Sequence, residues 1–203
     1  MRKFIISIDA GTTSNRSILF DLKGKPVFSS QKEFTQYFPK SGWVEHNPEE
    51  IWKTTVKTLK DVIQKAKKLR GEILNIGITN QRETTVLWDK RTGKPVYNAI
   101  VWQDRRQEEF CAKLRKQNKD TMIFNKTGLL IDSYFSGTKI KWILDNVPKA
   151  KKLMSSNQLL FGTIDSFLIW RFTKGKVHAT DATNASRTMI YNITSNQWDD
   201  TIL

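Results

Sequence analysis

The stretch from residue 4 to residue 21 reads FIISIDAGTTSNRSILFD, two apolar runs separated by a polar turn. Each run is too short for a helix and is rich in β-branched and aromatic residues, which predicts strands at residues 4–9 and 16–21. Residues 23–26, Lys-Gly-Lys-Pro, have the composition of a second turn, and residues 27–34 are typical of a third strand. The N-terminal region is therefore predicted to be a three-stranded meander.

The pattern changes at Asn47, which is a plausible helix N-cap followed by Pro48 and two acidic residues. The apolar residues that follow recur at spacings of three and four, which predicts a helix ending near residue 69, before Gly71. Residues 73–79 and 84–88 are short β-branched runs and predict two more strands. Strands on both sides of a long helix indicate a mixed α/β fold.

Helical patterns dominate from residue 105 onward, at residues 105–117, 135–145 and 163–172. The last residues, 196–203, are predicted to begin a further helix. No low-complexity tract, repeat or Pro/Ser-rich linker interrupts the chain. We therefore expect residues 1–203 to form one continuous but incomplete domain.

The chain carries 34 basic and 20 acidic side chains, a formal charge of +14. Its most basic segment, residues 53–70, alternates with apolar residues at helical spacing and is typical of the solvated face of a helix. Because no zinc-finger spacing, helix-turn-helix or base-stacking motif accompanies the charge, we expect no nucleic-acid partner.

One cysteine, Cys111, excludes an internal disulfide and is interpreted as an inert helix residue. His46 and His178 stand alone, so neither is expected to bind a metal. No signal sequence and no apolar run of about 18 residues is found, so we expect a cytoplasmic protein with no membrane partner.

The turn at residues 9–14, Asp-Ala-Gly-Thr-Thr-Ser, contains the first candidate site. Three successive hydroxyls and their N–H groups can surround phosphate oxygens, Gly11 lets the backbone approach closely, and Asp9 is suited to hydrated Mg²⁺. The sequence has no Walker A loop and no G-x-G-x-x-G motif. On these six residues alone, an ordinary hairpin turn is an equally good interpretation.

A second candidate site is the polar cluster at residues 78–85, centred on Asn80, Gln81, Arg82 and Glu83. An arginine donor beside a glutamate acceptor can bind neighbouring hydroxyls of a polyol. In isolation, a surface ion pair in a turn is the better interpretation.

Six blocks in order resemble the FGGY family of carbohydrate kinases, in particular its members that phosphorylate glycerol. These blocks are residues 9–14, 42–46, 77–84, 97–103, 134–142 and 183–189. The resemblance implies a ribonuclease H-like, or actin-like ATPase, fold with a mixed sheet flanked by helices. It also implies two similar domains that close over ATP and a polyol, with this chain forming most of the first.

The resemblance implies a role for ten residues. ATP would be bound by Gly11, Thr12, Thr13, Ser14 and Arg16, and Mg²⁺ by Asp9. Glycerol would be bound by Arg82, Glu83 and Tyr134, with Trp102 as an apolar wall against its carbon chain. No catalytic residue is expected in this segment, because the family's catalytic Asp lies in a Gly-Asp-Gln context that these 203 residues lack.

The implied activity is ATP-dependent phosphorylation of glycerol to sn-glycerol 3-phosphate by the full-length protein, which would release ADP and is expected to form a homo-oligomer. The isolated segment is expected to be inactive. Ala10 stands where glycerol-phosphorylating members commonly carry Gln, so another polyol or a ketose stays open as the substrate. A non-catalytic nucleotide-binding module is the alternative from a different functional class.

Overall fold

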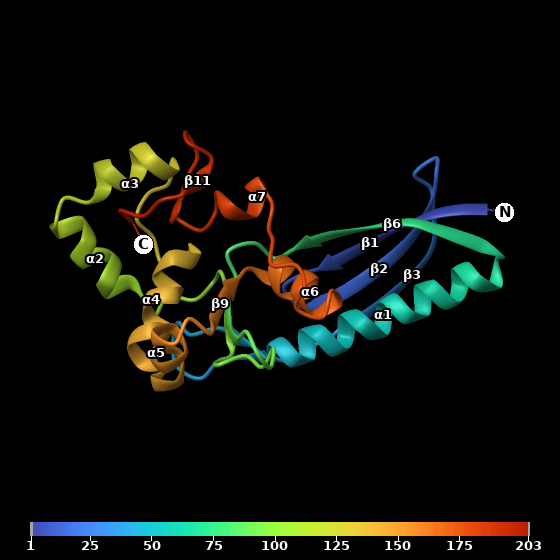
Figure 1. The fold of residues 1–203 in the computed structure, drawn as a ribbon, viewed down its shortest axis with the longest axis horizontal. Helices are drawn as coiled ribbons and strands as arrows, with labels where there is room; N and C mark the ends of the chain where they lie inside the picture. Colours follow the sequence, from blue (N-terminus) through green and yellow to red (C-terminus); the bar gives the residue numbers. More distant parts are fainter. Residues whose placement is uncertain (1, 203) are drawn as a thin grey trace. The chain divides into compact units, whose positions relative to one another are not determined.

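The computed structural model describes residues 2–202, which divide into two compact units (Figure 1). Unit 1 contains residues 2–36 and 47–81, and unit 2 contains residues 37–46 and 82–202. The chain thus leaves unit 1 for one short loop and returns to it before entering unit 2 for the rest of its length.

Unit 1 is built on a four-stranded mixed sheet with the order β3-β2-β1-β6. Strands β1 (Arg2–Ala10), β2 (Ser14–Asp21) and β3 (Pro26–Glu33) form an antiparallel meander, and β6 (Gly71–Asn80) pairs with β1 in parallel. The predicted meander and the strand at residues 73–79 are confirmed. The mixed α/β class is confirmed as well.

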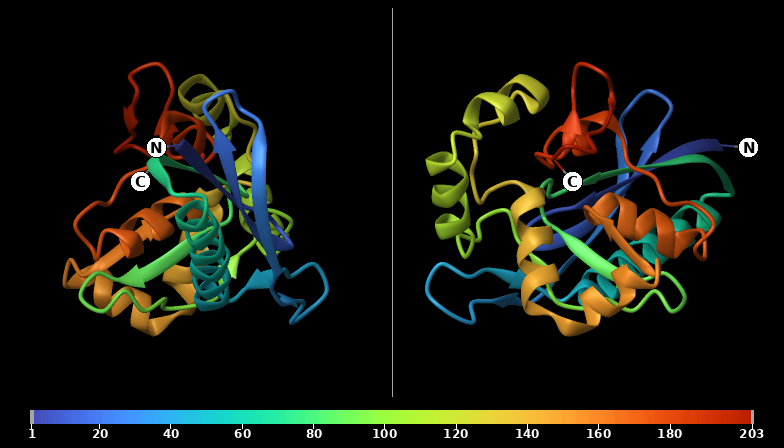
Figure 2. Two further views of the ribbon diagram at one scale, coloured as in Figure 1. Left: turned by 90° about the vertical axis from the view of Figure 1, so that its right-hand side faces the viewer. Right: turned by 60° about the vertical axis from the view of Figure 1, so that its left-hand side comes forward.

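Helix α1 (Pro48–Lys68) connects the meander to β6 and lies along one face of the sheet (Figure 1; Figure 2, left). Asn47 caps it by accepting a 2.9 Å hydrogen bond from the Glu49 N–H. Ile51 and Val62 on the helix, and Ile6 on β1, are fully buried. The predicted cap, length and buried face of this helix are therefore confirmed.

Polar contacts also join α1 to β2, directly after the turn at residues 11–13. Asn15 Nδ2 donates to the Ile51 carbonyl at 2.9 Å and to Thr54 Oγ1 at 2.6 Å. Asn15 is completely buried. Because a buried amide is costly unless it is hydrogen-bonded, these contacts fix the start of β2 on the helix.

Unit 2 combines short strands with helices. Strand β5 (Glu45–His46) pairs antiparallel with β8 (Ala99–Ile100) in a sheet of order β4-β5-β8, where β4 is Gln36–Tyr37, and β7 (Val86–Asp89) pairs antiparallel with β9 (Leu159–Gly162). The helices are α2 (Glu108–Lys116), α3 (Asp120–Thr127), α4 (Ser136–Asn146), α5 (Pro148–Ser155), α6 (Ile164–Phe172) and α7 (Ala182–Ala185). The three predicted helices correspond to α2, α4 and α6.

The prediction of a helix starting at residue 196 is wrong. Strand β10 (Tyr191–Asn192) pairs with β11 (Gln197–Trp198) in a hairpin, and Asn196 has a left-handed φ of 55°. The Asn192 side chain accepts hydrogen bonds from the Thr194 and Ser195 N–H groups, which closes the turn. The hydrogen bonds of the Asn192 side chain therefore favour a turn over the predicted helix. Residue 203, the last residue of that prediction, lies outside the described residues.

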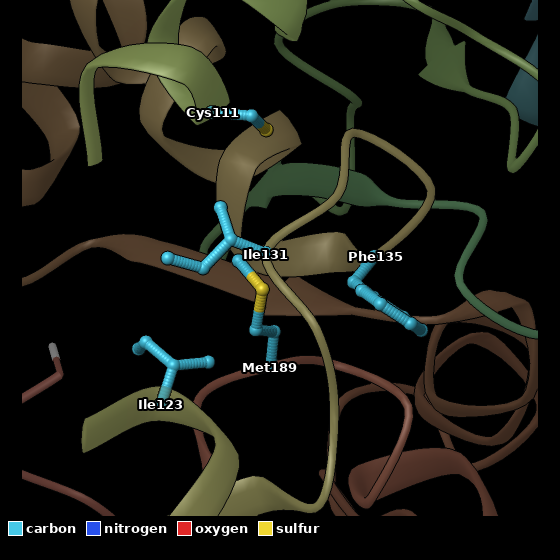
Figure 3. Packing of buried hydrophobic residues seen from close by; sticks show 5 residues of the cluster. All are labelled: Cys111, Ile123, Ile131, Phe135 and Met189. Atoms are coloured by element: carbon cyan, nitrogen blue, oxygen red, sulfur yellow. The ribbon is translucent and has the colours of Figure 1, made fainter. Parts of the chain in front are cut away.

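A buried apolar cluster in unit 2 joins α2, α3 and the segments around residues 131–135 and 189 (Figure 3). It contains Cys111, Ile123, Ile131, Phe135 and Met189. Burial raises the pKa of the Cys111 thiol to about 11, so the thiol stays protonated and packs as a small apolar side chain.

None of the helices within residues 2–202 combines the length and the apolar composition needed to cross a membrane.

Candidate functional site

The turn at residues 11–13 joins β1 to β2 in a closely paired hairpin. The Gly11 N–H donates to the Ser14 carbonyl at 3.0 Å, and Asp9 stands opposite Arg16 in the strand register. Arg16 Nη2 lies 3.0 Å from Asp9 Oδ2. A Cβ at Gly11 would approach the Ser14 carbonyl to 3.1 Å, so only glycine fits this turn without displacement.

The carbonyl groups of this turn point toward donors on the rest of unit 1. The Gln81 N–H donates to the Ala10 carbonyl at 2.8 Å, and Gln81 Nε2 donates to the Gly11 carbonyl at 3.0 Å. Gln36 Nε2 donates to the Thr12 carbonyl at 3.0 Å. A carbonyl oxygen repels an anion. Because these carbonyls are hydrogen-bonded to the two glutamines, the hydroxyl and N–H groups are the ones through which the turn could bind phosphate.

Asp9 lies two residues before Gly11, near the end of β1, and its side chain is 36% exposed. No group of three or more His, Cys, Asp or Glu side chains within residues 2–202 could hold a metal on its own. Mg²⁺ keeps several waters and usually takes one or two carboxylates together with substrate phosphates. The donor set therefore fits a hydrated Mg²⁺ that arrives with a polyphosphate.

The second candidate site, in unit 2, begins at a tight turn centred on Glu83. The Thr84 N–H donates to the Arg82 carbonyl at 2.7 Å, and Glu83 has a φ of 61°. The Glu83 carbonyl accepts from Ser136 Oγ at 3.1 Å and from Thr85 Oγ1 at 3.0 Å. Such a γ-turn is strained for a residue other than glycine, and strain of this kind concentrates at functional sites.

The Glu83 side chain, which is 3% exposed, forms an ion pair with Arg187, whose Nε lies 2.5 Å from Oε1. The Arg187 guanidinium lies 5.4 Å from the centroid of the Tyr134 ring and 4.9 Å from that of Phe135. The Tyr134 and Trp102 rings are 5.5 Å apart. The structure thus brings a buried carboxylate, an arginine and two half-buried aromatic rings together from four separate segments.

Arg82 forms no hydrogen bond or ion pair with the described side chains of this group. It is exposed, and its carbonyl takes part in the turn while its guanidinium donates to no residue within 2–202. The predicted residues Glu83, Trp102 and Tyr134 are therefore joined through contacts, and Arg82 is placed next to them by the chain alone.

The segment that presents Tyr134 is held by a buried lysine at the start of α4. Lys139 is 1% exposed and donates to the carbonyls of Ser133 at 2.9 Å, of Phe135 at 3.2 Å and of Tyr134. Burial lowers the pKa of Lys139 to about 7, although the nearby carboxylates act in the opposite direction. One side chain thus fixes three successive carbonyls.

Sequence reasoning missed Arg187, Lys139 and Gln36. It placed Gln81 in the predicted polar cluster but missed the contact of this side chain with the Gly11 carbonyl. Lys139 stands between Thr138 and Ile140 in a predicted helix that also carries Lys141, so nothing in the local pattern marks it as the buried lysine. Arg187 lies 104 residues from Glu83, and nothing in the local sequence connects the two.

Comparison with known proteins identifies the family to which the chain is similar. A model described as the N-terminal domain of the FGGY family of carbohydrate kinases matches residues 4–203. The chain is 60% identical over 202 residues to a glycerol kinase of Malacoplasma penetrans and 57% identical over 203 residues to a glycerol kinase of Alkaliphilus metalliredigens. These matches cover 100% of this chain but 40% and 41% of the two relatives, so the chain spans about two fifths of their length.

Comparison with solved structures points to the same family. A crystal structure of Plasmodium falciparum glycerol kinase with ADP has a TM-score of 0.94 at 38% identity, and covers 99% of this chain and 40% of that one. A gluconate kinase from Lactobacillus acidophilus has a TM-score of 0.86 at 26% identity over 100% of this chain and 39% of that one. The expected ribonuclease H-like, actin-like ATPase fold and the expected resemblance are confirmed, and the chain belongs to the FGGY family of carbohydrate kinases.

Proposed function

We propose that the complete protein transfers the γ-phosphoryl group of ATP to a primary hydroxyl of glycerol, giving sn-glycerol 3-phosphate and ADP. Relatives that are 56–60% identical across the whole chain carry the name glycerol kinase, which supports glycerol over other acceptors. In this proposal, residues 1–203 form most of the N-terminal domain.

The observation that carries the proposal is the buried Glu83 carboxylate paired with Arg187, whose guanidinium lies over the Tyr134 ring, with the Trp102 ring against that of Tyr134. A polyol presents hydroxyls that donate to a carboxylate and a carbon chain that packs against aromatic surface. The exposed Arg82 would donate to the hydroxyl oxygens that Glu83 does not reach. These residue types match a small acceptor that has hydroxyls on adjacent carbons.

The turn between β1 and β2 would bind the ATP phosphates. Its proposed contacts come from the residues at which hydroxyls, N–H groups and a guanidinium gather: Gly11, Thr12, Thr13, Ser14 and Arg16. Asp9 would hold Mg²⁺ through water, and the ion would neutralise charge on the phosphates. The glutamines behind the turn keep its carbonyls away from the anion.

The residues of this segment bind and orient, and they do not take the proton of the attacking hydroxyl. The family's catalytic Asp lies in a Gly-Asp-Gln context that does not occur in the 203 residues. Orientation is a large part of phosphoryl transfer, because holding the acceptor in attack geometry removes much of the entropic barrier. Loss of an orienting residue should therefore raise KM for the acceptor more than KM for ATP.

The test is an assay of ADP release by the complete protein with glycerol, xylulose, gluconate and other polyols. We expect glycerol to give the highest kcat/KM. Glu83→Gln and Arg82→Ala should each raise KM for glycerol by about 10- to 100-fold, the value of a charged hydrogen bond, with KM for ATP unchanged. Arg105→Ala, at another exposed arginine of unit 2, is the matched control.

Two results would contradict the proposal in different ways. A higher kcat/KM with xylulose or gluconate would leave the kinase and overturn glycerol as substrate. Nucleotide binding without ADP release for any acceptor would favour the non-catalytic nucleotide-binding module.

A further inference from the structure

The Arg187 side chain contacts two of the proposed acceptor-binding residues at once. It pairs with the Glu83 carboxylate and lies over the Tyr134 ring. Arg187 itself is 29% exposed, whereas Glu83 is 3% exposed. The arginine therefore lies between the buried Glu83 carboxylate and the Tyr134 ring, where it can fix the orientation of both side chains.

The Glu83 carboxylate has one oxygen engaged and one not. Arg187 Nε donates to Oε1, and no residue within 2–202 donates to Oε2. The Glu83 carbonyl is held separately by Ser136 and Thr85. With the backbone and Oε1 both held, the second oxygen keeps a fixed position from which to accept a hydrogen bond from a hydroxyl.

The position of Arg187 is itself fixed by the fold. Asp181 caps α7 by accepting from the Asn184 N–H at 2.8 Å, and the Arg187 N–H donates to the Asn184 carbonyl at 3.1 Å. The Gly137 N–H then donates to the Thr188 carbonyl at 2.7 Å, which ties this segment to the start of α4. The guanidinium is therefore pre-organised over Tyr134 and Phe135 by backbone contacts on both sides.

We propose that Arg187 is a positioning residue that aims the free oxygen of Glu83 at one hydroxyl of the acceptor and so sets the selectivity for that hydroxyl. This inference rests on the proposed function, because it concerns the same acceptor site. A pair that served stability alone would not control the ratio between glycerol and an analogue lacking one hydroxyl. A site built to accept a hydroxyl rejects such an analogue strongly, because its buried acceptor is then left unpaired.

The experiment compares kcat/KM for glycerol, propane-1,2-diol and propane-1,3-diol in the complete protein, with thermal melting of every variant. In Arg187→Gln, the preference for glycerol over the diol that lacks the hydroxyl bound by Glu83 should fall by about tenfold or more. Glu83→Gln should lower the same ratio, and the double variant should lower it no further, because the two residues act as a unit. KM for ATP should stay unchanged.

Two further variants sharpen the result. Arg187→Lys keeps the charge but loses the planar guanidinium, so it should recover part of the lost preference. Arg171→Gln is the matched control, since Arg171 also lies over an aromatic ring of unit 2, that of Phe167 at 5.5 Å. If Arg187→Gln does not fold, Arg187→Lys is expected to show a smaller reduction of the same ratio.

An unchanged ratio in a folded Arg187 variant would overturn the inference, and so would full additivity with Glu83→Gln or an equal effect of Arg171→Gln. Failure of the proposed function is recognised separately, in the unmodified protein, by a preference for another acceptor. The same comparison is then made with that acceptor and its deoxy derivative. If no acceptor is phosphorylated at all, both the function and the inference are wrong.

Discussion

Arg106 Nη2 lies 2.8 Å from Glu45 Oε1, and the same nitrogen lies 2.8 Å from Asp104 Oδ2. All three side chains are at most 3% exposed. The guanidinium also lies 3.8 Å from the Trp43 ring centroid and 4.6 Å from that of Trp142. One arginine thus pairs with two buried carboxylates while it packs between two indoles.

Arg106→Met should destabilise the protein by about 3–5 kcal/mol, because it leaves two buried carboxylates without their cation. Urea denaturation followed by tryptophan fluorescence measures the loss. Lys141→Met, which breaks an exposed ion pair with Asp145 in the same unit, should change the unfolding free energy by less than about 1 kcal/mol. Equal losses in the two variants would contradict this assignment.

Gln81→Leu should weaken ATP binding, because it removes the donor that engages the Gly11 carbonyl behind the turn. We expect KM for ATP to rise about 2- to 10-fold, the value of one neutral hydrogen bond, and KM for the acceptor to stay the same. Gln64→Leu, at an exposed position on α1, serves as control. A rise in the acceptor KM alone would show that Gln81 acts on the other candidate site.

Lys139→Met should abolish a specific pH dependence of stability. Burial lowers the pKa of this lysine to about 7 in the folded state, well below its value in an unfolded chain, so the unfolded state binds more protons between these two values. The unfolding free energy of the unmodified protein should therefore rise relative to the variant as pH increases above 7, by up to about 1.4 kcal/mol per pH unit.

The measurement is the difference in unfolding free energy between Lys139→Met and the unmodified protein at pH 6, 8 and 9.5. Lys151→Met, at an exposed lysine on α5, should show a difference that does not vary with pH. A constant difference for Lys139→Met would mean that this lysine titrates at an ordinary value in the folded protein.

Residues 1–203 expressed alone should release no ADP from ATP with any acceptor, because they lack the Gly-Asp-Gln aspartate that the family uses as base. The check is the same ADP assay run beside the complete protein at equal concentration, with circular dichroism to establish that the shorter chain is folded. Acceptor-dependent ADP release by the shorter chain would show that a base lies within it.

Local sequence patterns predicted the elements that local chemistry determines. The meander and α1 follow from apolar periodicity, the cap at Asn47 and the turn residues between the strands. Helix α5 lies outside the predicted helices: it begins at Pro148, and a proline, which ends a helical pattern, is also favourable at the first position of the next helix. The hairpin of β10 and β11 depends on the side chain of Asn192, whose role in the turn is visible only in three dimensions.

In the candidate sites, too, some features can be predicted from local sequence and others become visible only in the folded structure. Contiguous motifs identified the turn that follows Asp9 and the cluster that contains Glu83. A long-range partner such as Arg187 could not be found from local sequence, because a pairing across 104 residues leaves no mark on the composition or periodicity of either segment. Lys139 contacts residues only four to six positions away, but its burial depends on the packing of the whole unit. Sequence patterns therefore identify contiguous polar clusters better than they identify the distant side chains that hold those clusters in place.

The γ-turn at Glu83 limits how the proposed acceptor site can be redesigned. At a φ of 61°, glycine, asparagine and aspartate are tolerated. A β-branched residue would strain the backbone and would also lose the contacts of the Glu83 side chain. Position 83 is thus a poor choice for a broad mutational library. Directed evolution of the proposed acceptor preference should start from Trp102 and Tyr134, neither of which has a left-handed φ.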